Sequence, residues 1–388
     1  MDGININEYS YNLPAERIAR YPLAERDRSK LLVYRAGQVY HTVFRNLPGI
    51  IPPRQLLVFN NTRVVQARLL FQKESGARIE IFCLEPHDPP DYYQAFGRQG
   101  SCTWKCLVGN ARKWKEGILK MEAGGPFSAV LQASPEGKTG SAFLVRFSWE
   151  PPDLSFSQVM ETAGNTPIPP YLEREAEDDD RMRYQTVYAK IEGSVAAPTS
   201  GLHFTDEILS RIRETGNGFL ETTLHIGAGT FQPVAAADIR EHNMHRERIY
   251  FSTGMLRSLI SNEGRILAVG TTSVRTIESL YWLGVKSMVY PDIPDRGMVL
   301  DQWDAYELPG GYSLKESLTA LGACLDKSGR SSMEAVTQLL IMPGYRFRLV
   351  NRMITNFHMP RSTLLLLVSL CIRGLEKQDR SGWSRKRS

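Results

Sequence analysis

Short apolar runs that end in polar or glycine-containing turns recur along the chain. The run LLVFN at 56–60 predicts a buried strand, and the polar turn Asn60-Asn61-Thr62-Arg63 follows it. The stretch ETTLHIG at 221–227 predicts a strand that runs into Gly227 and Gly229, and RILAVG at 265–270 predicts another that runs into Thr271-Thr272-Ser273. Open α/β sheets usually bind ligands beyond the carboxyl ends of their strands, so these turns are candidate binding positions.

Helical periodicity follows the later strands. Thr205 is the expected N-cap of a helix over DEILSRIRETG, which stops at Gly216. A second helix is expected to begin at 271–273 with its apolar side chains on one face. Arg275 and Glu278 stand three residues apart on another face of that helix and therefore lie together. Strands and helices in alternation predict a mixed α/β fold.

The pattern changes between about 66 and 150. Stretches such as ARIEIFCLE, TWKCLVG and SAFLVRFSW are separated by Gly, Pro and Ser clusters, which predicts a small antiparallel β-barrel domain. Its Trp104, Trp114 and Trp149 fit a buried core better than stacking on RNA bases. The expected division is a larger mixed α/β domain over 1–65 and 151–388, interrupted by the β domain over 66–150.

Three other stretches carry weaker signals. The acidic run 173–180 is expected to be a solvated loop. Residues 283–336 have weak periodicity and frequent Gly and Pro, so they are expected to form an insertion with one helix from Leu314 to Leu325. The apolar run 364–372 is well short of the roughly 20 residues that cross a bilayer, and is expected to be a buried strand or helix.

Composition limits the class of protein. With 388 residues, of which 42% are hydrophobic, the chain can bury a large core. The formal net charge of +5 permits RNA binding without requiring it. Charges throughout the first thirty residues leave no room for the apolar part of a signal peptide, so a cytoplasmic protein without membrane association is expected. The five cysteines form no CxxC pair, which disfavours a disulfide framework or a zinc ribbon.

Histidines are concentrated in the second half of the chain. Five of the seven lie after residue 200 beside Gly, Thr, Asn or acidic residues, which favours a functional site: His203, His225, His242, His245 and His358. His242 and His245, with the carboxylate of Glu247 nearby, also fit a zinc site. The segment lacks the HExxH order, so no metal is expected, and a metal-dependent hydrolase built on these three residues stays as an alternative.

The longer motifs resemble those of one family. They are RDRSKLLV, LLVFNNTRVVQARL, GSVAAPTSGLHFT, TLHIGAGTFQPV, HNMHRE, ILAVGTTSVRTIES and PGYRFRLVNRMITNFHMPRSTLLLLVSL. Over nearly its whole length the chain is similar to the S-adenosylmethionine:tRNA ribosyltransferase-isomerases of the bacterial queuosine pathway. The small residues of GSVAAPTSG and GAGTF suit close approach of a ligand to the backbone.

The resemblance implies a substrate pair and a product. A member of this family transfers and isomerises the ribosyl moiety of S-adenosylmethionine onto the 7-aminomethyl-7-deazaguanine wobble base of a tRNA with a GUN-type anticodon. It gives epoxyqueuosine and releases adenine and methionine. S-adenosylmethionine is the co-substrate, no further cofactor or metal is expected, and the protein is expected to be a monomer.

The resemblance and the predicted strand ends together suggest roles for individual residues. The expected catalytic residues are His203, His225, Glu247 and Glu278, with the two histidines as an acid–base pair because imidazole titrates near neutral pH. Arg275 is expected to hold the methionine carboxylate. Further expected substrate-binding residues are Asn60, Thr62, Arg63, Ser194, Thr199, His245, Thr271, Thr272, Asn356 and His358.

Three positions depart from the family pattern. Asn61 stands where the resemblance leads us to expect Asp, Gln66 where we expect Pro, and Ser200 where we expect Ala. Segment 283–336 is also longer than in typical members. These departures leave open a paralogue with a shifted substrate, and Asn61 also leaves open a tRNA-binding paralogue that lacks the chemistry.

Overall fold

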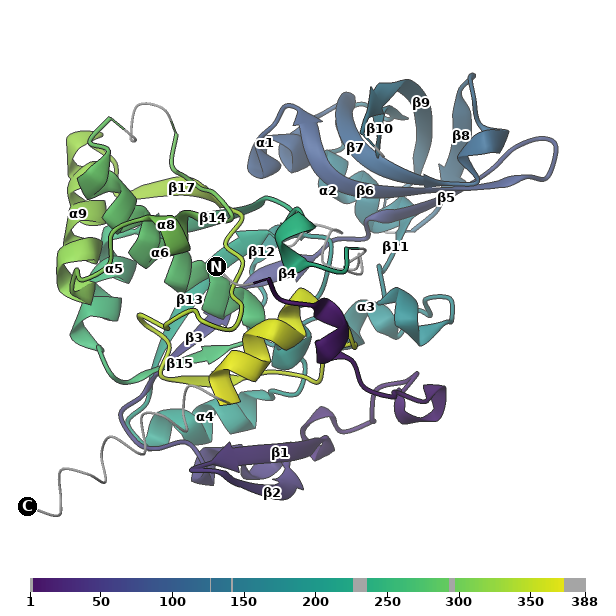
Figure 1. Ribbon diagram of the computed structural model, residues 1–388. Coiled ribbons are helices and arrows are strands. Elements are labelled where there is room, and N and C mark those ends of the chain that lie inside the picture. The colour runs from purple at the N-terminus through teal and green to yellow at the C-terminus, as the bar shows by residue number, and fades with distance from the viewer. Residues whose placement is uncertain (1–2, 126, 141, 226–235, 293–296, 373–388) are drawn as a thin grey trace, which may run out of the picture.

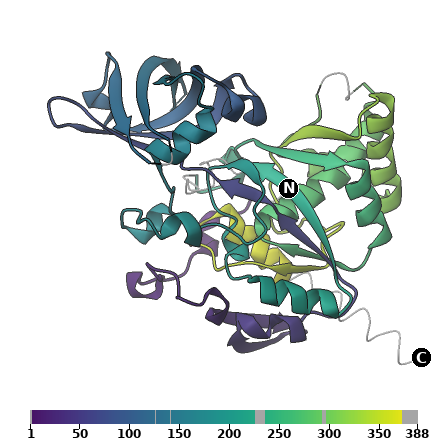
Figure 2. The same cartoon turned by 180° about the vertical axis from the view of Figure 1, so that it is seen from behind.

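The computed structural model describes residues 3–125, 127–140, 142–225, 236–292 and 297–372. Two seven-stranded sheets dominate it, one mixed and one antiparallel and curled, and they lie side by side in Figures 1 and 2. The expected mixed α/β fold with a separate small β unit is therefore confirmed. No described helix is long and apolar enough to cross a membrane.

The main sheet has a parallel centre. The strand pairs β13–β3, β3–β15 and β15–β18 are parallel, whereas β14 runs antiparallel to both β13 and β17. In spatial order the strands are β16 (Val299–Leu300), β17 (Ser332–Thr337), β14 (Glu247–Ser252), β13 (Gly218–His225), β3 (Leu56–Asn60), β15 (Ile266–Val269) and β18 (Arg352–Ile354).

Strands β3 and β15 are buried on both faces, as continuous apolar runs predict for the centre of a parallel sheet. Leu56 and Val58 of β3 pack in one core cluster, and Leu57 and Phe59 pack in another. Alternate side chains of a strand point to opposite faces. The central strands therefore join two separate cores.

Helices cover the two faces of the main sheet unequally. On one face lie α5 (Thr253–Ser261), α6 (Thr271–Val289) and α9 (Leu314–Lys327), and α6 and α9 pack so closely that Gly284 faces the backbone of Ser317. On the other face lie α4 (Asp206–Glu214) and the 3₁₀ turn η4 (Phe44–Gly49). The Thr205 side chain accepts a hydrogen bond from the Ile208 amide at 3.3 Å, which confirms the predicted N-cap.

The second sheet is antiparallel and curls over its own core as an open half-barrel (Figure 1). Trp104, Trp114 and Trp149 are buried, so their expected place in a core is confirmed. Its strands in spatial order are β11 (Gly164–Asn165), β5 (Arg68–Gln72), β6 (Arg78–Asp88), β7 (Ser101–Gly109), β10 (Ala142–Glu150), β9 (Ala129–Thr139) and β8 (Leu119–Ala123). Two helices, α1 (Tyr92–Gly97) and α2 (Phe156–Ala163), pack against the same core.

This packing unit includes α2 and β11, which the expected β domain of 66–150 leaves out. The exact division of the chain into domains stays a prediction. The remaining elements are short: η1 (Ile6–Tyr9), η2 (Ala15–Arg17), η3 (Arg26–Arg28), β1 (Lys30–Arg35), β2 (Gln38–Val43), β4 (Thr62–Val64), η5 (Ala111–Lys113), η6 (Pro170–Leu172), α3 (Asp180–Arg183), β12 (Ile191–Ser194), η7 (Thr199–Gly201), η9 (Ile239–Glu241) and α8 (Asp304–Glu307).

Two local predictions are wrong, and a third is confirmed only in part. Thr62–Val64 form strand β4 and pair in parallel with β12, so the polar stretch after β3 is not a simple turn. Residues 283–336 are not an insertion: they contain the last seven residues of α6, all of α9 and most of the sheet strand β17. The single helix expected at 314–325 is confirmed as α9. The acidic run is only partly solvated, because Asp180 is buried and Arg174 binds both of its carboxylate oxygens, at 2.6 and 2.8 Å.

The crossing of α6 and α9 gives a stability prediction. In Gly284→Ala the new Cβ would lie 2.2 Å from the Ser317 carbonyl oxygen, so we expect a loss of about 1–3 kcal/mol in the free energy of unfolding, as overpacked sites show. Gly322→Ala on α9 is the matched control, because its Cβ meets only Leu256 at 3.9 Å; it should be stabilising by about 0.5–1 kcal/mol. Urea unfolding of both variants measures the difference, and equal stabilities would contradict the packing.

Candidate functional site

One edge of the main sheet collects most of the polar candidates. Asn60 ends β3, His225 ends β13, Thr271 follows β15 and Asn356 follows β18. Because these four strands are parallel, their carboxyl ends meet at the same edge. Glu247 begins β14, which runs the opposite way, and therefore lies at this edge as well. The polar residues expected at the strand ends do gather at one edge of the sheet, and ligand binding there stays a prediction.

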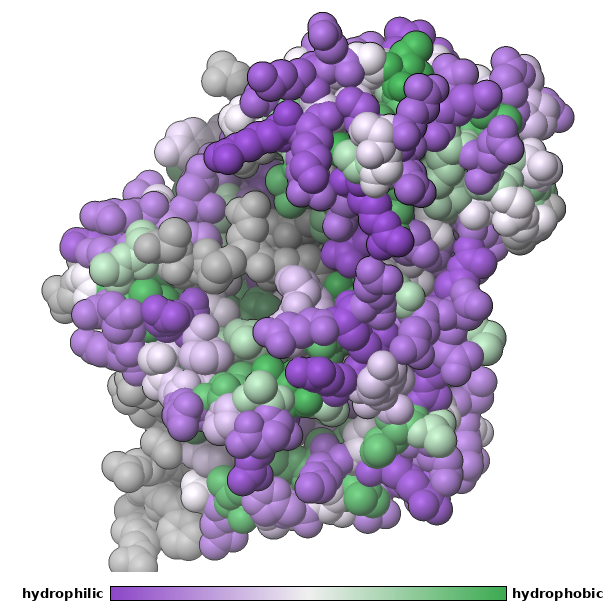
Figure 3. Space-filling model, turned by 90° about the vertical axis from the view of Figure 1, so that its right-hand side faces the viewer, coloured by the Kyte–Doolittle hydropathy of each residue, from purple (hydrophilic) through white to green (hydrophobic). Residues whose placement is uncertain are grey.

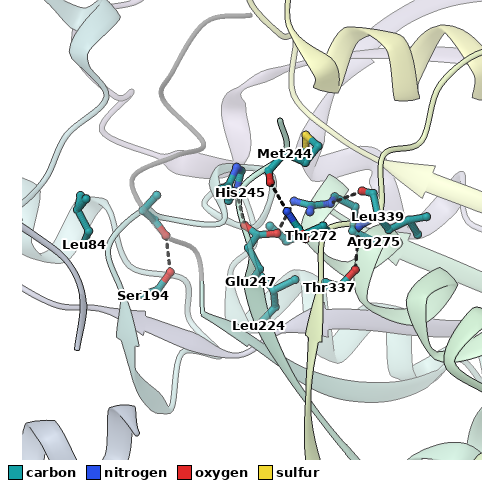
Figure 4. Close-up of polar contacts among 12 residues, drawn as sticks. Leu84, Ser194, Leu224, Met244, His245, Glu247, Thr272, Arg275, Thr337 and Leu339 are labelled. Atoms are coloured by element: carbon teal, nitrogen blue, oxygen red, sulfur yellow. Dashed lines mark hydrogen bonds and ion pairs between the residues drawn. The ribbon is translucent and has the colours of Figure 1, made fainter. Parts of the chain in front are cut away.

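A buried charged group stands at this edge (Figure 4). The Arg275 guanidinium donates through Nη1 to Glu247 Oε2 and through Nε to the Leu339 carbonyl at 3.2 Å. The other carboxylate oxygen of Glu247 lies 3.0 Å from His245 Nε2. Burial acts to raise the pKa of Glu247, but the positive charges of Arg275 and His245 outweigh it, so the pKa lies below its ordinary value. Glu247 is therefore an anion that holds both partners.

This charged group forms one wall of a pocket. Thr271 and Thr272, the first residues of α6, form its polar floor, and Leu340, Leu364 and Leu367 are among its apolar lining. Backbone amides at the start of a helix have no partner within the helix and favour an anion. Arg275 Nη2 is buried without a hydrogen-bond partner among the described residues. Beside this pocket, Arg275 Nη2 is therefore a donor that a carboxylate could use.

Two glutamines hold the segment 242–245 against the pocket. Gln302 Oε1 accepts from the Met244 amide at 2.9 Å, and Gln302 Nε2 donates to the His242 carbonyl at 2.8 Å. Gln338 Nε2 donates to the Met244 carbonyl at 2.8 Å. These contacts fix the backbone that carries His245.

His203 belongs to a second polar group at the same edge. Its Nε2 lies 3.1 Å from Asn356 Oδ1, and the Asn356 amide donates to Ser200 Oγ at 3.2 Å. Ser200 in turn lies against Gly270, immediately before the threonines of the pocket. Burial lowers the pKa of His203, although the hydrogen bond to Asn356 opposes the shift. A neutral imidazole here is able to accept a proton.

His358 stands in the same C-terminal segment as Asn356. Its Nε2 lies 2.9 Å from Thr355 Oγ1, and its carbonyl accepts from Tyr11 Oη at 2.5 Å. Burial lowers the pKa of His358 to about 4. This histidine is neutral at physiological pH, and its contacts orient the loop after β18.

His225 is enclosed where the two sheets meet. Its ring stacks on Tyr92 of α1, with centroids 4.5 Å apart and an interplanar angle of 10°, and it meets Tyr250 edge-on. On Gly193, which has φ +133°, a Cβ atom would lie 2.4 Å from His225 Nδ1, so only glycine fits there. Burial lowers the pKa of His225 to about 4. His225 is therefore neutral, and its position depends on the curled sheet.

Glu278 does not reach the pocket. Its fully buried carboxylate accepts hydrogen bonds from Tyr345 Oη at 2.7 Å and from three consecutive backbone amides of residues 348–350 at about 2.9 Å. These contacts tie α6 to the segment that leads into β18. Of the four residues expected to converge on one cavity, only Arg275 lines the pocket described above, whereas His203, His225 and Glu278 do not; their catalytic roles stay predictions.

The remaining binding candidates are dispersed. Asn60 is buried and bridges β3 to β13 through both the amide and the carbonyl of Leu224. Arg63 is exposed, with Glu192 3.9 Å away, whereas Thr62 is buried. Ser194 Oγ donates to the Ala196 carbonyl, apart from the Arg275 group (Figure 4), and Thr199 begins η7. The GAGTF stretch, with Gly227 and Gly229, lies outside the described residues.

Local contacts explain the departures from the family pattern. Asn61 Nδ2 donates to Glu221 at 3.2 Å and its Oδ1 accepts from Thr223 at 2.9 Å, so a carboxylate at position 61 would face Glu221 with like charge. Gln66 Oε1 accepts from Thr166 at 2.8 Å. The Ser200 hydroxyl accepts the hydrogen bond from Asn356 described above. Each departure has a structural partner.

The metal alternative has little support in this geometry. The Glu247 carboxylate is shared between His245 and the Arg275 guanidinium, whose positive charge repels a metal ion. No cluster of three or more His, Cys, Asp or Glu side chains with metal-binding geometry occurs within the described ranges.

The chain is similar to known proteins over nearly its whole length. Residues 6–378 match the family described as queuosine biosynthesis protein. The chain belongs to this family. Proteins named S-adenosylmethionine:tRNA ribosyltransferase-isomerase are 36% identical in Pelobacter propionicus, where the match covers 94% of this chain and 90% of the relative, and 39% identical in Gloeobacter violaceus, where it covers 94% and 86%.

The crystal structure of an S-adenosylmethionine tRNA ribosyltransferase from Thermotoga maritima is 25% identical to the chain. It matches 97% of this chain and 95% of its own, with a TM-score of 0.40. The match to the family over residues 6–378 and the two relatives confirm the family that the sequence motifs indicate. Sequence reasoning missed Tyr92, which no motif signals because it lies more than a hundred residues from His225, in the other sheet's unit.

The enclosed His225 gives a pH prediction. In the unfolded chain His225 binds a proton below about pH 6.5, whereas in the folded protein its pKa is about 4. Folding stability therefore falls as the pH decreases through this window. Between pH 7 and pH 5 we expect this residue to account for a loss of about 2 kcal/mol. Urea unfolding at both values should show a smaller loss in His225→Phe, whereas His87→Phe, at an exposed histidine, should keep the wild-type dependence.

Proposed function

We propose that this protein transfers and isomerises the ribosyl group of S-adenosylmethionine onto the 7-aminomethyl-7-deazaguanine wobble base of tRNA, giving epoxyqueuosine, adenine and methionine. The observation that carries the proposal is the pocket at the start of α6. It combines the buried positive charge of Arg275, the first residues of α6 and apolar walls in a chain of this family. S-adenosylmethionine presents the matching carboxylate, sulfonium and apolar thioether arm.

Arg275 binds the methionine carboxylate in this proposal. Its Nη1 and Nε are held by Glu247 and Leu339, which orients the plane of the guanidinium and leaves Nη2 for the ligand. The N-terminal amides of α6 add donors to the same anion. An ion pair in a buried position is worth more than one in water because the local dielectric is lower.

The chemistry needs one proton removed from the ribose carbon and one delivered to the purine, and the aminomethyl nitrogen of the tRNA base releases a further proton when it forms the new C–N bond. The sulfonium acidifies the protons of the adjacent ribose carbon, so a neutral imidazole can abstract one and leave an ylide-like carbanion. Expelling adenine requires a proton on the purine, and methionine then leaves as a neutral thioether. We assign the acceptor role to His203, whose pKa is lowered by burial. We assign the donor role to His245, which lines the pocket and whose Nε2 lies 3.0 Å from Glu247 Oε1.

His225 takes a different role in this assignment. Its ring is covered by Tyr92 and by the backbone of Gly193, and it resists protonation down to about pH 4. It therefore positions the end of β13 rather than donating a proton. Glu278 likewise anchors α6 and is left out of the proton transfers.

The tRNA base has to leave the stacked anticodon to reach the adenosyl group. Asn60, Thr62 and Arg63 stay candidates for binding the nucleotide, and of these only Arg63 is exposed. Localisation in the cytoplasm, the monomeric state and the GUN-type anticodon belong to the same proposal.

The overall activity is tested by product analysis. The protein is incubated with S-adenosylmethionine and tRNA that carries the aminomethyl-deazaguanine, and the digested nucleosides are analysed by mass spectrometry. We expect epoxyqueuosine together with equal amounts of adenine and methionine. Binding of tRNA without release of either product would instead support a paralogue that lacks the chemistry.

The histidine assignment predicts a graded effect on adenine release. His203→Ala and His245→Ala should each lower kcat about 10²–10⁴-fold, as loss of a general acid or base does. His225→Ala should lower it less and should change the pH dependence of stability as well. Turnover near the wild-type value in both His203→Ala and His245→Ala would exclude the pairing.

Arg275→Lys keeps the charge but removes the planar pair of donors. We expect the KM for S-adenosylmethionine to rise by about 10- to 100-fold, because one charged hydrogen bond is worth about 1.5–3 kcal/mol. The kcat should change much less. Arg265→Lys, at an exposed arginine, is the control, and an unchanged KM in Arg275→Lys would remove Arg275 from the carboxylate site.

A further inference from the structure

The curled sheet carries an exposed cationic loop that the catalytic edge does not use. The loop ARKWKEG at 111–117 joins β7 to β8 and presents Arg112, Lys113 and Lys115 to solvent. None of these three cations forms an ion pair with a described residue, whereas Arg68 and Arg146 of the same sheet lie 2.9 and 3.7 Å from carboxylates. Glu116 is the only acidic residue within the loop. The loop therefore has uncompensated positive charge.

A buried side chain and hydrogen bonds to the backbone fix the conformation of the loop. Trp114 is 2% exposed, and its indole Nε1 donates to the Gly117 carbonyl at 3.0 Å. Asn110 begins the loop in the left-handed region with φ 57°, and its side chain donates to the Arg78 carbonyl at 3.0 Å. Lys73 from the neighbouring hairpin donates to the Lys113 carbonyl at 3.0 Å. The backbone beneath the three cations is thus fixed, which reduces the entropy lost when a ligand binds.

The position of the loop indicates a large ligand. Strand β7 has nine residues, and at about 3.3 Å per residue its ends are roughly 25–30 Å apart. Tyr92 of α1 touches His225 of the main sheet and also Trp104, near the start of β7, whereas the loop follows the end of β7. S-adenosylmethionine bound at the pocket is too small to reach the loop. A nucleic-acid stem spans such a distance.

We propose that the loop 110–118 binds the sugar–phosphate backbone of tRNA outside the anticodon, through Arg112, Lys113 and Lys115. This inference rests on the proposed function for the identity of the RNA. Because Trp114 is buried, no aromatic ring of the loop is free to stack on a base, so the contact is electrostatic and independent of sequence. Hydrophilic residues also dominate the face of the curled sheet seen in Figure 3.

A membrane surface fits the loop less well. Peripheral membrane segments combine basic residues with a row of large apolar side chains that enter the lipid. Within the loop, Ile118 is the one exposed large hydrophobic residue, at 67%. The charge therefore favours phosphates presented by a nucleic acid.

The test uses the full-length triple variant Arg112→Ala, Lys113→Ala, Lys115→Ala. The matched control is Lys315→Ala, Lys327→Ala, Arg330→Ala, which removes three exposed cations on and after α9. The dissociation constant for an unmodified tRNA transcript is measured by fluorescence anisotropy at several salt concentrations. At moderate salt we expect the dissociation constant of the loop variant to be about 10- to 100-fold higher than that of the wild type. The slope of the logarithm of the dissociation constant against the logarithm of the salt concentration should fall by about 2–3. The control should bind as the wild type does.

The outcome separates this inference from the proposed activity. The binding of tRNA is measured without S-adenosylmethionine and therefore does not depend on turnover. If tRNA affinity depends on the loop but the protein releases no adenine, the proposed activity is wrong and the role of the loop stands. With active protein, the loop variant should keep its kcat at saturating tRNA and its KM for S-adenosylmethionine. Unchanged tRNA affinity, an equal loss in the control, or loss of binding only to phosphatidylserine vesicles would overturn the loop's role.

Discussion

The buried contact between Glu247 and Arg275 joins the two halves of the candidate site. Glu247 belongs to the first position of β14 and Arg275 to the first turns of α6, so the pair fastens the sheet edge to the helix that forms the pocket floor. Removing one partner from such a buried pair commonly costs about 3–5 kcal/mol, because the other charge is left unpaired. Each charge therefore holds the other in place, and His245 takes its orientation from the same carboxylate.

The same helix is fixed at three levels. Its first residues face the pocket, Glu278 in its second turn binds the amides of residues 348–350, and Gly284 further along allows α9 to approach. Along this one helix, Arg275 lines the pocket, whereas Glu278, one turn later, makes only structural contacts. A buried carboxylate is therefore not by itself a sign of catalysis, since Glu278 and Glu247 differ only in what surrounds them.

The curled sheet contributes to both substrates in the proposed function. One end of it places Tyr92 on His225 of the main sheet, and the other end carries the cationic loop. The first contact encloses a histidine in a dry environment and keeps it neutral. The second presents charge to solvent, where it acts over a longer range and depends on salt. In the proposed function, the curled sheet thus lies between the site that binds the tRNA base and the loop that binds the tRNA backbone.

The sequence alone determined the strands that are buried on both faces, the α/β class, the capped helix α4 and the polar edge at which β3, β13, β15 and β18 end. Those features depend on local periodicity and on the rule that parallel strands end together. It also determined the family, because the motifs are long. Which polar residues share a pocket was decided by tertiary structure only. Glu278 turned toward backbone amides, His225 met a ring from the other sheet, and α6, α9 and β17 absorbed a stretch that looked like an insertion. Side-chain direction and partners distant in sequence set these outcomes, and neither leaves a periodic signal along the chain.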